Sequence, residues 1–225
     1  MPVKKLIGIF ILVLGLGLCY LLISKHSTFC HLQSKTIGLV PFGNISEAEV
    51  DSVKSSIKRM YKTDVVILNS EKMPAMAYTT IRYPRYRADS LLNWLTNYCP
   101  DTLRMVVGLT NKDISITKYN KGTKEIKEPK WKYKDFGIFG LGRIRGNACI
   151  VSSNRLHKNV SKNVFYERLN RIACHEVGHV HGLRHCPNKN CLMNDANESI
   201  KTIDQSTGDL CKTCWKELNL SSFYN

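Results

Sequence analysis

The residues best suited to chemistry lie between His175 and Met193, in the sequence HEVGHVHGLRHCPNKNCLM. His175 and His179 are four residues apart, so on an α-helix with 3.6 residues per turn both imidazoles project from one face. Glu176 directly follows the first histidine and can reach a water on the metal without binding the metal itself. This spacing predicts a zinc site in which the glutamate acts as general base.

A third nitrogen ligand follows at the expected distance. Gly182 comes three residues after His179, and a glycine can take a positive φ, end the helix and turn the chain back. The return delivers His185, which completes the long HExxHxxGxxH pattern of the metzincins. Three protein ligands leave the fourth tetrahedral position for water, as a catalytic zinc requires. The alternative is a helix with ordinary histidines, but it does not account for a glycine and a third histidine at the spacing of the motif. His181 is two residues from His179 and therefore projects away from the face that bears the ligands.

Four cysteines predict a second metal site beside the first. Cys186 and Cys191 form one close pair, and Cys211 and Cys214 form a CxxC pair after residues 194–210. Four thiolates make a closed zinc site, which is structural because no position stays open for substrate. Two disulfides are the alternative in an exported domain, but the tight CxxC chelate favours zinc. The remaining cysteines are scattered and odd in number, unlike a disulfide framework: Cys19, Cys30, Cys99, Cys149 and Cys174.

Several elements must position these ligands. Residues 164–181 carry an apolar stripe at helical spacing, so the helix that bears the histidines is expected to be buried. Upstream, a strand at 36–42, a helix that begins with the Ser46–Glu49 capping box and a strand at 64–69 predict a right-handed βαβ unit. Further elements follow from the same patterns: a helix from Asp89 to before Pro100, strands at 103–109 and 114–119, and a terminal helix around 209–220.

The segment before the motif helix is rich in glycine. Residues 136–146, FGIFGLGRIRG, lack the GxGxxG order of a nucleotide loop, so we expect the glycines to allow close backbone approach beside the metal. Residues 147–153 read as a strand, either the edge that pairs with an extended peptide substrate or an ordinary central strand.

The chain is strongly basic. Its 225 residues carry a net charge of +15, which favours acidic partners without choosing among them. Residues 118–134 contain seven lysines together with Trp131 and Tyr133. This segment is expected to be a solvated loop or hairpin, with contact to acidic or nucleic-acid partners as the weaker alternative because charge runs usually face water. Nucleic acid is therefore not the expected partner.

The N-terminus predicts a membrane anchor. Residues 6–23 are 18 uncharged residues, close to the length of about 20 that spans a bilayer, and no small-residue cleavage site follows. We expect an anchor at 1–24, a tether at 25–35 and a catalytic domain at 36–225. The lysines on the two flanks nearly balance, and the short N-terminal tail favours a single-pass protein with its domain outside the cytoplasm.

The sequence resembles the archaemetzincin family of zinc metallopeptidases. The resemblance rests on HExxHxxGxxHCxxxxCxM followed by 17 residues and CxxC, and on the run FGIFGLGRIRGNACIVSSNRL upstream; it extends over about 36–218. It implies a compact α/β (α+β mixed) metzincin-like fold, with a twisted mixed sheet packed on an active-site helix. The single transmembrane helix expected before this domain departs from the family's usual pattern. It also implies two zinc ions, one on His175, His179 and His185 and one on the four cysteines, and a methionine turn at Met193.

The predicted function is hydrolysis of peptide bonds in a peptide or protein substrate, by a monomer, through a zinc-bound water with Glu176 as general base. A non-catalytic, zinc-stabilised module that binds nucleic acid or anionic membrane is the alternative. Glu176 argues against the alternative, because binding does not require a carboxylate beside an open zinc.

Overall fold

The computed structural model of the chain describes residues 35–195 and 199–221. Over these residues the larger sheet has five strands in the order β2-β1-β5-β9-β8. The first four are parallel: β2 (Val65–Ile67), β1 (Ile37–Phe42), β5 (Met105–Thr110) and β9 (Ala148–Ser152). The last, β8 (Gly140–Gly142), is antiparallel to β9. The expected mixed sheet is thus confirmed.

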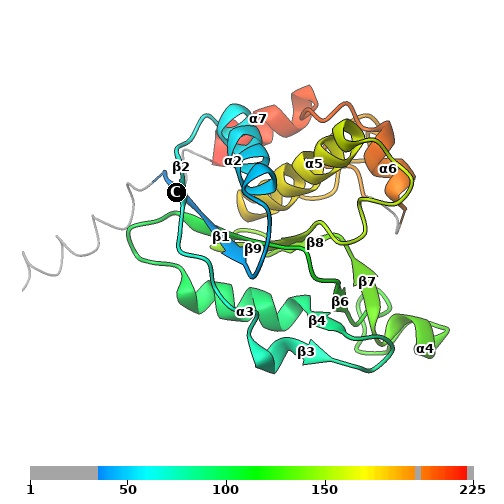
Figure 1. Cartoon of the computed structure of the whole chain (residues 1–225). Coiled ribbons are helices and arrows are strands. Elements are labelled where there is room, and N and C mark those ends of the chain that lie inside the picture. The colour runs from blue at the N-terminus through cyan, green and yellow to red at the C-terminus, as the bar shows by residue number, and fades with distance from the viewer. Residues whose placement is uncertain (1–34, 196–198, 222–225) are drawn as a thin grey trace, which may run out of the picture. The chain divides into compact units, whose positions relative to one another are not determined.

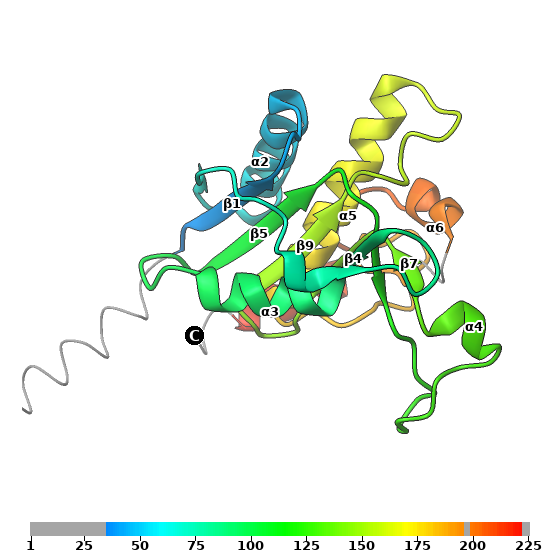
Figure 2. The same ribbon diagram turned by 60° about the horizontal axis from the view of Figure 1, so that its bottom comes forward.

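Helices cover both faces of this sheet (Figures 1 and 2). α2 (Glu47–Tyr61) and α5 (Lys162–Val180) lie on one face, and α3 (Ala88–Tyr98) lies on the other. Side chains alternate along each strand, so Val107 of β5 packs with the α2 and α5 layer while Val106 packs with α3. The sheet is therefore buried on both faces, which holds α5 and its histidines on a rigid support.

Local signals in the sequence set the ends of these helices. Ser46 Oγ accepts a hydrogen bond from the Glu49 amide at 3.2 Å, and the Glu49 carboxylate accepts one from the Ser46 amide at 3.3 Å. This reciprocal pair confirms the predicted capping box and begins α2, which connects the parallel strands β1 and β2 as expected. The predicted terminal helix is α7 (Lys212–Ser221), and a short helix, α6 (Ile200–Gln205), precedes it.

A second, smaller sheet was not predicted. Over the described residues it has the strand order β3-β4-β6-β7, built from β3 (Tyr78–Thr79), β4 (Arg85–Arg87), β6 (Ile114–Ile116) and β7 (Phe136–Ile138). The strand expected at 114–119 is present over Ile114–Ile116, but the expected alternation of buried and exposed residues is not found there, because Ser115 is buried as well as Ile114. Strands of two or three residues are too short to give a periodic sequence signal.

The strand at 147–153 is not an edge strand. β9 lies between β5 and β8, so the possibility that it pairs directly with substrate is wrong and the ordinary central strand is correct. The chain turns back after β8 and places that strand beside β9, with Leu141 opposite Ile150. In the part of the chain that is described, β8 therefore forms the margin of the larger sheet.

The predicted membrane anchor at 6–23 lies outside the described residues, and it stays a prediction. Among the residues that are described, no helix has the length and apolar character needed to cross a bilayer. The lysine-rich segment forms a hairpin, in which Tyr119 bridges Ile126, followed by the short helix α4 (Lys130–Tyr133).

Candidate metal centre and catalytic cleft

Helix α5 ends where the motif requires a change of direction. Gly182 has a φ of +103°, its amide donates to the His179 carbonyl at 2.9 Å, and the Leu183 amide donates to the Gly178 carbonyl at 2.9 Å. This pair of bonds is a Schellman motif, which satisfies carbonyls at the helix end and needs a left-handed residue. The chain then reverses and carries His185 back to the face of α5 that bears His175.

The three predicted histidines converge. One ring nitrogen of each lies within 4.8 Å of the corresponding nitrogens of the other two. The ring centroids are separated by 4.6 Å for His175 and His179, 5.4 Å for His175 and His185, and 4.9 Å for His179 and His185. His181 takes no part, because its ring stacks on Tyr61 at 5.0 Å on the other side of the helix. Three imidazoles around one point are a donor set typical of zinc.

Oxygen atoms behind the rings orient them for metal binding. His175 Nδ1 lies 2.8 Å from the Leu192 carbonyl, and His179 Nδ1 lies 2.8 Å from the Leu183 carbonyl. A carbonyl only accepts, so each Nδ1 carries the proton and each Nε2 keeps its lone pair. His185 Nδ1 lies 3.5 Å from Asp195 Oδ2. Sequence reasoning missed the Leu192 and Leu183 carbonyls, because a backbone carbonyl leaves no mark in the residue type.

Glu176 lies beside this cluster, against the glycine-rich strand β8. The Gly142 amide donates a hydrogen bond to the Glu176 carboxylate. A Cβ on Gly142 would lie 2.5 Å from the Glu176 carbonyl oxygen, and one on Gly140 would lie 2.7 Å from Glu176 Cγ. The expectation that glycines in 136–146 allow close backbone approach at the site is therefore confirmed at these two positions.

Burial sets the protonation of the site. It raises the pKa of Glu176 to about 8, against the opposing effect of the Gly142 amide. Burial together with the nearby His179 lowers the pKa of His175 to about 4, and burial also lowers the pKa of His179. The imidazoles of His175 and His179 are therefore neutral and ready to bind a metal at neutral pH. A dication on them would lower the pKa of Glu176 by charge attraction.

Met193 lies under the metal-binding turn of α5. It is fully buried, and a Cβ on Gly178 would come within 2.6 Å of Met193 Sδ and 3.1 Å of the Tyr61 hydroxyl. Gly178 stands between the two helical histidines, so the methionine supports the turn that carries both. The predicted position of Met193 beneath this site agrees with its packing.

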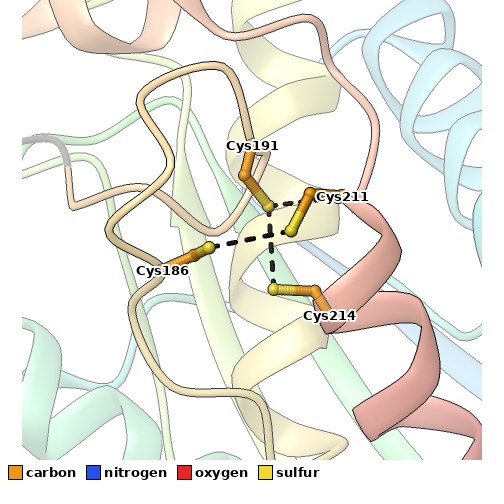
Figure 3. A group of neighbouring side chains, drawn as sticks. All are labelled: Cys186, Cys191, Cys211 and Cys214. Carbon is orange, nitrogen blue, oxygen red and sulfur yellow. Dashed lines mark hydrogen bonds between the residues drawn. The ribbon is translucent and has the colours of Figure 1, made fainter.

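The four predicted cysteines point toward one another from two loops and the start of α7 (Figure 3). The sulfurs of Cys186 and Cys211 are 3.8 Å apart, and those of Cys191 and Cys214 are 3.7 Å apart. A disulfide would need about 2.05 Å, whereas four sulfurs at about 2.3 Å from a tetrahedral zinc are about 3.8 Å from one another. All seven described cysteines have free thiols. The arrangement thus fits zinc rather than two disulfides.

Backbone contacts favour the thiolate form in this cluster, whereas burial raises the pKa of Cys191 and of Cys214. The Cys214 amide donates to the Cys211 sulfur, and this is the main cause that lowers the pKa of Cys211 to about 7. The Cys211 amide lies 3.3 Å from the Cys191 sulfur and donates to it. Thiolates are the form in which cysteine binds metals.

The two clusters share one short piece of chain. Leu192 follows Cys191, its carbonyl accepts the hydrogen bond from His175, and its amide donates to the Asp209 carbonyl at 2.8 Å. The Cys186 amide donates to the Met193 carbonyl, also at 2.8 Å. The cysteine cluster therefore braces the catalytic side at both His175 and His185.

A cleft of about 580 Å³ opens in front of the histidines and Glu176. β7 and β8 form one wall, and α6 contributes Thr202 and Ile203 to the other. Arg168 fixes α6 with two hydrogen bonds of 2.7 Å to the Asp204 carboxylate. Several cations also line the cleft: Lys118, Arg155, Arg171 and Arg184. Their gathering could not be seen in the sequence, because they come from four separate segments.

Residues 36–220 match peptidase family M54. The chain belongs to this family. It is a zinc metallopeptidase, as the histidine cluster and the match together indicate. The archaemetzincin of Halobacterium salinarum is 27% identical over 186 residues, which cover 79% of this chain and 96% of that protein. The Methanopyrus kandleri archaemetzincin is 30% identical over 143 residues, 64% of this chain and 70% of that one.

Solved structures of family members agree with the fold. The archaemetzincin of Archaeoglobus fulgidus complexed with malonate has a TM-score of 0.62 at 25% identity, covering 81% of this chain and 99% of that one. The Methanopyrus kandleri structure has a TM-score of 0.64 at 27% identity, covering 84% and 95%. The predicted resemblance to the archaemetzincins is confirmed by these comparisons.

Proposed function

We propose that this metallopeptidase hydrolyses peptide bonds with Glu176 as general base, and that His175, His179 and His185 hold the catalytic zinc. The observation that carries the proposal is the Glu176 carboxylate, held by the Gly142 amide beside three converging imidazoles at a cleft. When bound, zinc would lower the pKa of a water and polarise the substrate carbonyl.

Glu176 would accept a proton from the attacking water and then pass it to the leaving amine. Its contact with Gly142 occupies part of the carboxylate, and the remainder would accept the proton. β8 would bind the substrate, because a strand at the margin of a sheet can pair with an extended peptide through backbone hydrogen bonds. Gly140 and Gly142 let this strand lie close to Glu176, so a peptide paired with β8 would be held near that carboxylate.

The four cysteines would hold a second, structural zinc. Sulfur separations of 3.7 and 3.8 Å support this assignment, as does the enclosure of the cluster between the 186–194 loop and α7. A metal here would keep the Leu192 carbonyl against His175, so its role would be to position a ligand of the first metal.

The test is cleavage profiling of a peptide library by wild type and Glu176→Gln, with zinc counted per chain by elemental analysis. We expect two zinc ions in both proteins and a loss of at least about hundredfold in kcat/KM for the variant, the scale of general-base catalysis. Glu47→Gln, an exposed change on α2, is the matched control and should keep full activity. Hydrolysis that survives Glu176→Gln would contradict the general-base role, and one zinc per chain would contradict the second site.

A further inference from the structure

The lysine-rich segment forms a surface that leads out of the cleft. Lys118 and Phe136 both line the cleft, and the Lys118 ammonium lies 4.4 Å from the centre of the Phe136 ring. Beyond them Tyr133 stacks on Phe136 with ring centroids 5.4 Å apart. Lys127 and Lys132 lie over Tyr133 at 5.7 and 4.7 Å. We call these five residues the basic track: Lys118, Lys127, Lys132, Tyr133 and Phe136.

Charge along the track has one sign. Residues 118–134 contain seven lysines against two glutamates, Glu125 and Glu128. Glu128 already interacts with Lys130 at 3.8 Å. Arg184 lines the cleft and continues the positive charge toward the histidines, whereas Arg155 is paired with the Asp113 carboxylate at 2.6 Å and adds little to it. A groove with one sign of charge attracts ligands of the opposite sign and raises their local concentration.

The aromatic rings of the track lie close to cations, whereas Trp131 beside the track is 67% exposed. Arg82 lies 4.7 Å over the ring of Trp131, and the Tyr133 ring is stacked on Phe136 and approached by two lysines. Nucleic-acid surfaces that bind single strands expose aromatic faces on which bases stack. The Tyr133 ring, stacked on Phe136 and approached by two lysines, is covered in this way, so the track itself presents lysines rather than an open ring face. The surface therefore fits a flexible chain of carboxylates better than it fits bases.

We propose that the basic track binds an acidic segment of the polypeptide substrate and guides it into the cleft. The inference rests on the proposed function for the chemistry at Glu176, but the binding step can be measured separately. Continuity between the track and the cleft at Lys118 and Phe136 is what makes a substrate the occupant. The segment recognised would carry several Asp or Glu residues a few positions away from the scissile bond.

Paired peptides test the proposal. A core sequence that wild type cleaves is extended at either end by five Glu or five Gln residues. For the extension that reaches the track, we expect kcat/KM to be about tenfold higher for the Glu peptide than for the Gln peptide at low ionic strength. The difference should lie in KM, and it is modest because each exposed ion pair contributes little. The preference should shrink in 0.5 M NaCl, where screening is nearly complete.

Two double variants separate the track from the overall charge. Lys127→Gln with Lys132→Gln should reduce the Glu/Gln ratio to less than twofold. Lys54→Gln with Lys72→Gln removes the same charge from α2 and the loop after β2, and should keep the tenfold ratio. Because both peptides are compared on one protein, the ratio does not depend on the fraction of folded molecules. A ratio that survives the track variant, or falls equally in the control, overturns the proposal.

Binding to the Glu176→Gln protein separates an acidic peptide from nucleic acid or lipid as the ligand of the track. It also tests the track independently of the proposed peptidase function. A fluorescent Glu-extended peptide should bind more tightly than its Gln counterpart, and the track variant should abolish the difference. Tighter track-dependent binding of oligo-dT, or of vesicles with 30% phosphatidylserine, at 150 mM salt would overturn a polypeptide occupant. If wild type with both zinc ions cleaves no peptide, the proposed function fails, and this binding comparison still decides the inference.

Discussion

Replacing Gly142 with alanine should disable the site while leaving the protein folded. An alanine Cβ would lie 2.5 Å from the Glu176 carbonyl oxygen and 3.2 Å from His179 Cβ. An ordinary contact between carbon and oxygen is about 3.3 Å or more, so β8 and α5 would have to separate by about 0.8 Å. Neither side can yield locally, because the contact is with helix backbone rather than with a flexible side chain.

The size of both effects follows from this displacement. Overpacking of a tight contact costs about 1–3 kcal/mol, and about 2 kcal/mol lowers the melting temperature of a domain of this size by roughly 4–8 °C. The same shift lengthens the hydrogen bond from the Gly142 amide to Glu176 and moves the strand that would bind the peptide. Since misplacement by 1 Å can cost about 10²-fold, we expect kcat/KM to fall about hundredfold.

The assay is peptide hydrolysis per folded molecule, with melting temperature and zinc content measured on the same samples. Gly43→Ala is the matched control, because φ is +65° there and an added Cβ meets no atom within 4 Å. It should cost about 1 kcal/mol through backbone strain alone and keep normal activity. If Gly142→Ala stays within threefold of wild type, the close approach of β8 to Glu176 is not needed for catalysis.

Two further predictions concern the other side of α5. Cys214→Ser should lose one zinc and lower activity by about 10–100-fold, the scale of losing a group that supports a metal ligand. The reason is that the Leu192 carbonyl would no longer be held against His175. Normal activity with a single zinc would refute this coupling. Burial lowers the pKa of His181 to about 4, so below its unfolded value of 6.5 the unfolded chain binds the extra proton and stability falls as pH drops from 6.5 toward 4. His181→Phe keeps the stack on Tyr61 but removes the titrating group. The free energy of unfolding, measured with urea at pH 7, 5.5 and 4.5, should therefore fall less in this variant than in wild type, by up to about 3 kcal/mol. An equal pH dependence of the two proteins would contradict this prediction.

Most of the predicted metal ligands could be recognised from the sequence, because short and characteristic spacings separate them along the chain. The helical period alone places His175 and His179 on one helix face, and Gly182 predicts the turn that brings His185 back toward them. The same holds for Cys211 and Cys214 and for the capping box at Ser46, since each depends on contacts within a few residues. Long buried strands such as β1 and β5 were also recognisable from their apolar runs.

Tertiary structure alone decided how distant segments meet. Nothing local to Leu192 indicates that its carbonyl orients His175, and nothing in β9 indicates that β8 covers its edge. Contacts of this kind join residues that are separated in sequence, and they form only when the sheet and α5 pack together. The glycines of 136–146 illustrate the division: their composition predicted close approach near the metal, but only the packed structure identified Gly142 as the one that holds Glu176. The basic track arose in the same way, as the lysines were visible in the sequence and their continuity with the cleft was not.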